Sequence, residues 1–121
     1  MKIKTTSRED YLKAILTLKN KTGLVRSVDV AKYLGVSKPS VSRAVATLVD
    51  GGFLTMDNHF FLHFTPAGQE VAEKTYERHC FFTRQLVAVG VDLETAEEDA
   101  CRLEHAISDQ SFEKLKAKLR S

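Results

Sequence analysis

The sequence predicts a mainly α-helical protein in two parts, residues 1–65 and residues 66–121, with one small β-hairpin at the end of the first part. Three observations carry this prediction. Capping residues followed by apolar side chains at helical spacing occur six times along the chain. Residues 53–64 change to the alternation of a β-hairpin. The net charge changes sign at Thr65-Pro66, where the fourth helix is expected to begin.

The first two helices are predicted from their start and stop signals. Thr6 and Glu9 form a capping-box pattern, in which Thr6 is the N-cap, and the helix should end near Thr22-Gly23. Ser27 is the expected N-cap of a short second helix, which stops at Gly35.

The third helix and the hairpin follow. Ser37 is the expected N-cap, Pro39 lies in the first turn where its missing N–H costs nothing, and Asp50-Gly51-Gly52 ends the helix. The hairpin should turn near Asp57-Asn58, and its second strand should carry an alternating apolar set, Phe60, Leu62 and Phe64.

The second part contains three predicted helices. Thr65-Pro66 opens a long helix that runs toward Gly90. Asp92 caps a fifth helix, which extends through Ile107. Ser108-Asp109 caps the last one.

Length and composition exclude several classes of protein. The chain has 121 residues, 43% of them hydrophobic and 28% charged, which suits one domain or two small ones. No apolar run reaches the roughly 18 residues of a membrane-spanning helix, and the N-terminus lacks an apolar signal core. We therefore expect a cytoplasmic protein without a membrane partner. Its two cysteines, Cys80 and Cys101, are then free thiols.

Residues 27–48 fit the pattern of a helix-turn-helix, in which Ala31 lets two helices approach and Gly35 gives the turn its backbone freedom. The outward face of the third helix carries hydroxyls and two cations near the helix N-terminus, the end that meets base edges and phosphates in this motif. These candidate DNA-binding residues are Ser37, Lys38, Pro39, Ser40, Ser42 and Arg43. Arg43 suits guanine, the serines suit phosphates, and the hairpin would be the wing of a winged helix.

Charge supports double-stranded DNA as the partner. Residues 1–65 carry ten Lys and Arg against five Asp and Glu, whereas residues 66–121 carry eight against eleven. A basic first part suits a polyanion. The alternative is a helical hairpin with a polar surface and no DNA role, but the wing, the charge and the hydroxyl-rich helix together favour DNA.

A metal-binding pattern lies in the acidic part. Cys101, Glu104 and His105 are spaced i, i+3 and i+4, so they share one helical face. Thiolate, carboxylate and imidazole suit Fe(II), Mn(II), Zn(II) or Co(II). His79 on the preceding long helix would lie opposite this face if the two helices are antiparallel. Taken singly, Cys101 could be a buried apolar residue, His105 a packed or surface histidine, and Glu104 a solvated charge, whereas the three together favour a metal site.

Three other functions compete with this hypothesis. An enzyme with a Cys101–His105 nucleophile lacks a Gly-rich oxyanion loop and an orienting third group, so we expect no catalysis and no small-molecule substrate. A constitutive winged-helix protein would use the cluster for structural zinc. A dimeric adaptor without DNA binding is disfavoured by Ser37, Ser40 and Arg43.

Five stretches carry a resemblance to a known family: Glu9-Asp10-Tyr11-Leu12, Val36-Ser37-Lys38-Pro39-Ser40-Val41-Ser42, Leu62-His63-Phe64-Thr65-Pro66-Ala67-Gly68, Arg78-His79 and Asp99-Ala100-Cys101-Arg102-Leu103-Glu104-His105-Ala106-Ile107-Ser108. In these the chain resembles the metal-dependent repressors of the diphtheria toxin repressor and manganese transport regulator family. The resemblance implies a homodimer with a winged helix-turn-helix DNA-binding part and a three-helix dimerisation and metal-binding part. It also implies activation by Mn(II) or Fe(II) and repression of metal-homeostasis genes at a palindromic operator.

Residue by residue, the resemblance implies a ligand set of Asp10, His79, Cys101, Glu104 and His105. The set is mixed, because an aspartate at position 10 is typical of manganese-type members and a cysteine at position 101 of iron-type members. A metal held by Asp10 and by the later ligands would join the two halves and fix the spacing of the recognition helices near one DNA turn, roughly 34 Å.

Two departures from the family pattern disfavour a second metal. Lys13 stands where manganese-type members have a carboxylate, and its ammonium is expected to pair with Glu104 or Asp10 instead. Thr83 stands where iron-type members have a glutamate. The chain also stops after the third dimerisation helix, so the resemblance implies a short form without the SH3-like domain of longer members.

Overall fold

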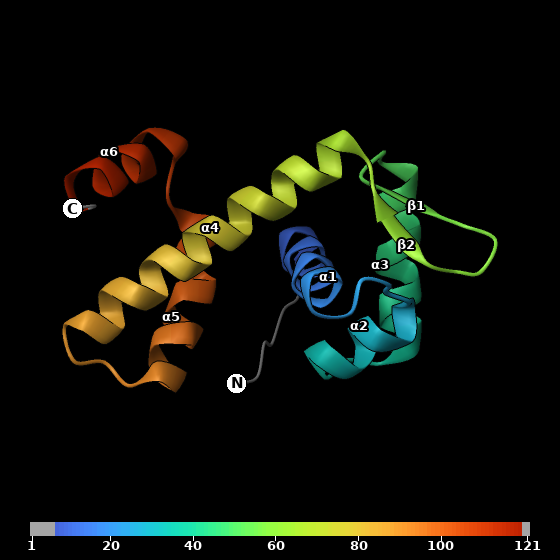
Figure 1. The fold of residues 1–121 in the computed structure, drawn as a ribbon, viewed down its shortest axis with the longest axis horizontal. Coiled ribbons are helices and arrows are strands. Elements are labelled where there is room, and N and C mark those ends of the chain that lie inside the picture. The colour runs from blue at the N-terminus through green and yellow to red at the C-terminus, as the bar shows by residue number, and fades with distance from the viewer. Residues whose placement is uncertain (1–6, 120–121) are drawn as a thin grey trace. The chain divides into compact units, whose positions relative to one another are not determined.

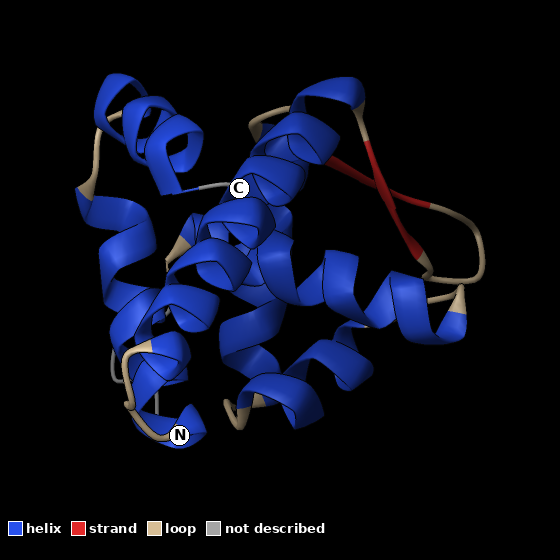
Figure 2. Ribbon diagram, turned by 60° about the vertical axis from the view of Figure 1, so that its left-hand side comes forward, coloured by secondary structure: helices blue, strands red, loops and turns tan. Residues whose placement is uncertain are grey.

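The computed structural model describes residues 7–119 and contains six helices and two strands within that range (Figure 1). In chain order they are α1 (Arg8–Thr22), α2 (Ser27–Leu34), α3 (Lys38–Asp50), β1 (Leu54–Met56), β2 (Leu62–Phe64), α4 (Pro66–Ala88), α5 (Leu93–Ala106) and α6 (Asp109–Leu119). The two short strands form a single hairpin among helices (Figure 2). The mainly α fold predicted from the sequence is confirmed. The chain divides into two compact units between Lys74 and Thr75, inside α4.

The first unit has one apolar core to which α1, α2, α3, both strands and the beginning of α4 contribute. Its fully buried side chains include Leu12, Ile15, Val25, Val30, Val41, Leu48, Leu54 and Leu62. The Leu62 N–H donates to the Val25 carbonyl at 2.8 Å, which ties the α1–α2 connection to the wing. Burial of this core is what holds α3 with its polar face outward.

The start of α1 differs from the sequence prediction by one residue. The N-cap is Ser7, whose hydroxyl accepts the Asp10 N–H at 3.1 Å, while the Asp10 carboxylate accepts the Ser7 N–H at 3.2 Å. The capping box is therefore Ser7–Asp10 rather than Thr6–Glu9, and Thr6 lies outside the described residues. Both pairs have a hydroxyl followed by an acid three residues later, so the sequence offers two overlapping boxes.

The start of α2 differs in the same way. Arg26 is the N-cap and Ser27 is the first helical residue. The Asp29 carboxylate accepts the Arg26 N–H at 2.9 Å, which satisfies one of the N–H groups that the helix start leaves without a helical partner.

Other predicted boundaries are confirmed. Ser37 caps α3 by accepting the Ser40 N–H at 3.2 Å, and Asp92 caps α5. Gly35 ends α2 in the left-handed conformation (φ 70°, ψ 32°), which glycine adopts without steric cost. Ile107 is the C-cap of α5 rather than its last helical residue.

The hairpin is shorter than the alternation predicts. Leu54 of β1 lies opposite Phe64 of β2 in an antiparallel pair, and the turn covers residues 57–61. Phe60 is not in the second strand, which begins at Leu62, because its backbone has a φ of 68°. Extended pairing cannot continue through a residue in that conformation.

The second unit contains the C-terminal part of α4 together with α5 and α6. Its core is aromatic: the Phe81 ring meets the Phe82 and Phe112 rings edge to face, with centroids 5.3 Å apart in each case. Phe112 of α6 is 1% exposed and Ala100 of α5 is fully buried. This core places one face of α5 against α4. Within residues 7–119, no helix is long and apolar enough to cross a membrane.

Candidate metal centre and DNA-binding surface

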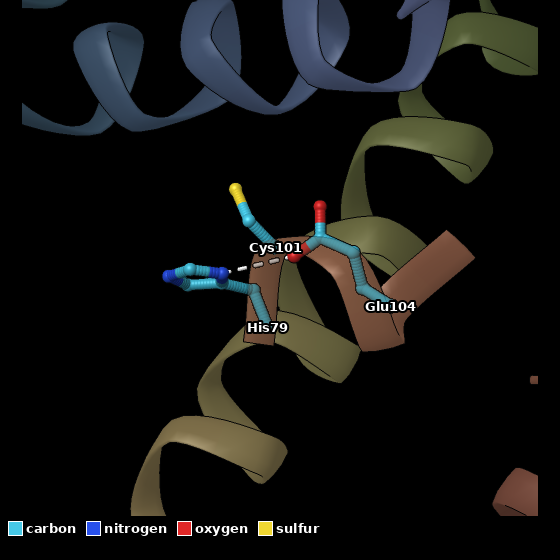
Figure 3. A group of neighbouring side chains, drawn as sticks. All are labelled: His79, Cys101 and Glu104. Carbon is cyan, nitrogen blue, oxygen red and sulfur yellow. Dashed lines mark hydrogen bonds and ion pairs between the residues drawn. The ribbon is translucent and has the colours of Figure 1, made fainter. Parts of the chain in front are cut away.

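Three candidate ligands from two helices of the second unit meet in the structure. His79 belongs to α4, and Cys101 and Glu104 belong to α5 (Figure 3). One nitrogen, sulfur or oxygen atom from each lies within 4.8 Å of the others. His79 Nδ1 is 2.9 Å from Glu104 Oε1. The juxtaposition of His79 with the Cys101–Glu104 face of α5 agrees with the arrangement expected from the sequence.

Glu104 is the centre of this group. Its side chain is fully buried, and its two oxygens face two different imidazoles: Oε1 faces His79, and Oε2 lies 3.3 Å from His105 Nε2. Burying a carboxylate is costly unless cations or hydrogen-bond donors surround it. A buried acid between two imidazoles and beside the Cys101 thiol therefore fits a site for a cation.

The donor set fits a divalent transition metal. Metal–ligand distances of about 2.0–2.3 Å place two ligands of one ion no more than about 4.6 Å apart. The atoms of His79, Cys101 and Glu104 lie within 4.8 Å of one another, so they need only small side-chain movements. Mixed nitrogen, sulfur and oxygen donors favour the first-row transition metals over Ca(II) or Mg(II).

The candidate DNA-binding residues gather at the N-terminal end of α3. All are exposed except Ser40, which is partly buried. The Ser37 and Ser40 hydroxyls are 2.8 Å apart, and Arg43 Nη2 lies 3.5 Å from Ser40 Oγ. The opposite face of α3 is buried through Val41, Val45 and Leu48. The structure thus presents hydroxyls and a guanidinium together at the end of the helix that the motif uses for recognition.

The wing turn contains a hydrogen-bond network that sequence reasoning missed. The Asp57 carboxylate accepts the N–H groups of His59 and Phe61 and lies 2.8 Å from His63 Nε2. The His63 hydrogen bond, followed by that from Phe61, lowers the pKa of Asp57 to about 2. The sequence predicts a turn at Asp57-Asn58. It does not predict the hydrogen bond between Asp57 and His63, because that contact depends on the register in which the two strands pair.

Two family models match the chain. The iron dependent repressor N-terminal DNA binding domain matches residues 4–59, and the iron dependent repressor metal binding and dimerisation domain matches residues 65–121. The HTH-type transcriptional regulator MJ0568 of Methanocaldococcus jannaschii is 34% identical over 112 residues, which are 91% of this chain and 90% of that protein. The chain belongs to the iron-dependent repressor family. It is a metal-dependent, DNA-binding transcriptional regulator with a dimerisation domain.

Other relatives and solved structures agree with this membership. The transcriptional regulator MntR of Salmonella typhimurium is 34% identical over 105 residues, 87% of this chain and 67% of that protein. The manganese regulator SloR superposes with a TM-score of 0.85 at 29% identity, covering 95% of this chain and 54% of that one. A manganese-dependent transcriptional repressor in complex with manganese has a TM-score of 0.81 at 29% identity, with 93% and 52% covered. The chain spans about half the length of these two solved structures.

The comparisons also bear on the competing functions. The curated relatives cited above are transcriptional regulators, and several of the solved structures are named as manganese regulators or manganese-dependent repressors. One such repressor, ScaR, has also been solved with bound Zn2+ and with bound Cd2+. These comparisons support the metal-dependent repressor and not the constitutive winged-helix protein with structural zinc.

Asp10, the remaining expected ligand of this family member, lies in the first turn of α1 in the first unit. It is 4% exposed, and besides its place in the capping box its Oδ1 lies 3.9 Å from Lys13 Nζ. Pairing with Asp10 is one of the two roles expected for Lys13. The role of Asp10 as a ligand stays a prediction.

At Thr83 the structure shows a hydroxyl where iron-type members are expected to have a carboxylate. Thr83 Oγ1 is buried and has no hydrogen-bond partner within the described residues. A hydroxyl lacks the charge and the reach of glutamate, so Thr83 is a poorer ligand for a second metal than a carboxylate at this position would be.

Proposed function

We propose that this family member binds Mn(II) or Fe(II) through Asp10, His79, Cys101, Glu104 and His105, and then represses metal-homeostasis genes. The observation that carries the proposal is the buried carboxylate of Glu104, which faces His79 and His105 through its two oxygens and lies beside Cys101. Zn(II) and Co(II) are expected to bind the same donors.

The charge of the bound site explains why a divalent ion suits it. Asp10, Glu104 and a deprotonated Cys101 would together carry three negative charges. A divalent ion would neutralise two of them, and the Lys13 ammonium, 3.9 Å from Asp10 Oδ1, offsets the third. The imidazoles bind a metal only in the neutral form, so metal binding releases protons and weakens as pH falls. When bound, the ion supplies charge neutralisation and a fixed geometry for the side chains of α4 and α5.

We assign residues 1–65 to DNA binding and residues 66–121 to dimerisation and metal binding. α1, which carries Asp10, contributes Leu12 and Ile15 to the core of the winged helix. Ligation by Asp10 and by residues of the second part would therefore link metal occupancy to DNA binding. Metal would lower the ordering cost of binding by reducing the number of conformations that the dimer samples.

On DNA, we propose that α3 enters the major groove. Arg43 reads a guanine, Ser37, Ser40 and Ser42 contact phosphates, and Lys38 adds charge. A homodimer would place two copies of α3 about one DNA turn apart, roughly 34 Å, which requires a palindromic operator.

We further propose that the protein acts in the cytoplasm and catalyses no reaction. Operator DNA is its partner. Metal coordination explains why Cys101 lies close to His79 and Glu104, so there is no need to assume that Cys101 is a catalytic nucleophile. Turnover that is lost in Cys101→Ala would contradict this assignment.

The decisive experiment is a metal titration of DNA affinity. A duplex is first selected from a random-sequence pool with Mn(II)-loaded protein, and its affinity is measured with Mn(II), Fe(II), Co(II), Zn(II) or excess chelator. Ionic strength is fixed because phosphate contacts make affinity fall steeply with salt. We expect at least a tenfold gain with Mn(II) or Fe(II), and loss of that gain in Glu104→Gln. Equal affinity with chelator and with metal would refute metal activation.

A further inference from the structure

We propose that Arg78 is a positioning residue for the metal centre. Its guanidinium fixes the last turn of α5, which carries Glu104 and His105, relative to α4, which carries His79. This inference rests on the ligand set proposed above, and it assigns a function to a buried cation that is not itself a ligand.

Arg78 directly precedes His79 on α4 and is only 7% exposed. One guanidinium nitrogen, Nη1, donates to the Ile107 carbonyl at 2.8 Å and lies 3.4 Å from the Glu104 carbonyl. The other, Nη2, pairs with the Asp109 carboxylate in the first turn of α6. A single side chain of α4 therefore contacts the end of α5 and the start of α6.

These contacts lie at the C-terminal end of α5, where backbone carbonyl groups need hydrogen-bond donors from outside the helix. The last carbonyl groups of a helix have no N–H within the helix to accept from, and α5 ends at Ala106. Arg78 donates to the carbonyls of Glu104 and Ile107, and its positive charge also suits the negative end of the helix dipole. Because the Glu104 backbone is held in this way, the position of its carboxylate depends on Arg78.

Arg78 is itself held firmly in place. Its guanidinium lies 5.2 Å from the centroid of the Phe112 ring, and that ring is 1% exposed and packs edge to face on Phe81. A planar, forked group reaches two carbonyls and a carboxylate at once, whereas the single ammonium of lysine cannot reproduce this geometry. The contact is therefore specific for arginine.

Stability alone accounts poorly for this arrangement. A buried charge is expensive even when it is paired, and hydrophobic residues of similar volume often stabilise a core as well or better. In addition, Arg78 Nε is buried without a hydrogen-bond partner within residues 7–119. A costly group that touches the backbone of one ligand and adjoins another in sequence fits a role in positioning.

The test compares variants of the full-length chain in Co(II) titrations. Metal binding is followed by the thiolate-to-cobalt absorption that Cys101 gives as a ligand, and unfolding is measured separately in chelator. We expect Arg78→Lys and Arg78→Gln to weaken Co(II) binding 10- to 100-fold, the range typical of residues that orient ligands. The thiolate band of the saturated variants should also shift, because the ligand geometry has relaxed.

Lys116→Met is the matched control. Lys116 Nζ also lies near the Phe112 ring, at 5.5 Å, and pairs with Glu77 and Glu113 rather than with the end of α5. We expect its Co(II) affinity to stay within about twofold of the parent protein, whatever its melting temperature.

Two results would overturn the inference. One is an unchanged Co(II) affinity in Arg78→Lys, and the other is a loss of affinity in Lys116→Met equal to that of the Arg78 variants. If Arg78→Gln does not fold, Asp109→Asn is used in its place, because that variant removes the carboxylate that pairs with Arg78 and leaves the guanidinium itself present. Absence of the thiolate band in the parent protein, with Cys101→Ser binding Co(II) equally well, would instead refute the ligand set itself.

Discussion

Cys101 is the residue that should decide which metal the protein prefers. Its sulfur lies with His79 and Glu104 in the candidate site, and a thiolate favours softer ions over Mn(II). We predict that Cys101→Glu shifts the ratio of Mn(II) to Co(II) affinity at least tenfold toward Mn(II). Competition titrations measure this ratio. Cys80→Ser, a change at the other free cysteine, should leave the ratio unchanged, and an unchanged ratio in Cys101→Glu would rule out Cys101 as a ligand.

Part of this site could be predicted from residue spacing alone. The i, i+3, i+4 pattern places Cys101, Glu104 and His105 on one face because helical geometry is local. The contacts of the Arg78 guanidinium with the end of α5 could not be predicted from the sequence, because they depend on where α5 ends relative to α4. The contact of His79 with one particular oxygen of Glu104 depends on the same packing.

At the scale of elements, the cap of α3 is the feature closest to the DNA-binding surface. Ser37 Oγ accepts the Ser40 N–H and is 2.8 Å from Ser40 Oγ. We predict that Ser37→Ala lowers the free energy of unfolding by about 1 kcal/mol, the usual cost of losing an N-cap. Ser42→Ala, on the exposed face of the same helix, should change it by no more than about 0.5 kcal/mol. Equal effects in denaturant titrations would show that the cap does not stabilise α3.

The wing gives a prediction about pH. The Asp57 pKa is lowered from 3.8 to about 2, first by the His63 side chain and then by the Phe61 N–H. A lowered pKa means that the carboxylate stabilises the folded wing fully above 3.8 and that this contribution is lost as pH falls toward 2. The carboxyl carbon shift of Asp57 should titrate with a midpoint near 2, and His63→Ala should raise that midpoint. A midpoint at 3.8 in the parent protein would contradict the hydrogen bonds.

Some boundaries of helices and strands could be predicted from the local sequence, and others could not. The caps at Ser37 and Asp92 could be predicted because no competing hydroxyl or acid precedes them at the right spacing. The start of α1 could not, because Thr6–Glu9 and Ser7–Asp10 both place an acid three residues after a hydroxyl, and the structure uses the second pair. Phe60 leaves the strand because the five-residue turn requires a left-handed residue, which no alternation pattern reveals.

For the whole molecule, the opposite charges of the two parts lead to a prediction about salt. The Lys and Arg excess lies in residues 1–65, whereas the candidate metal ligands other than Asp10 lie in the acidic part, residues 66–121. The slope of log affinity against log salt counts the phosphates that the protein neutralises. If metal acts by ordering the dimer, saturating metal should raise DNA affinity at every salt concentration and leave the slope unchanged. Affinity measured between about 50 and 200 mM salt tests this. A slope that changes with metal would mean that the ion acts chiefly by reducing the repulsion between its acidic ligands and DNA phosphates.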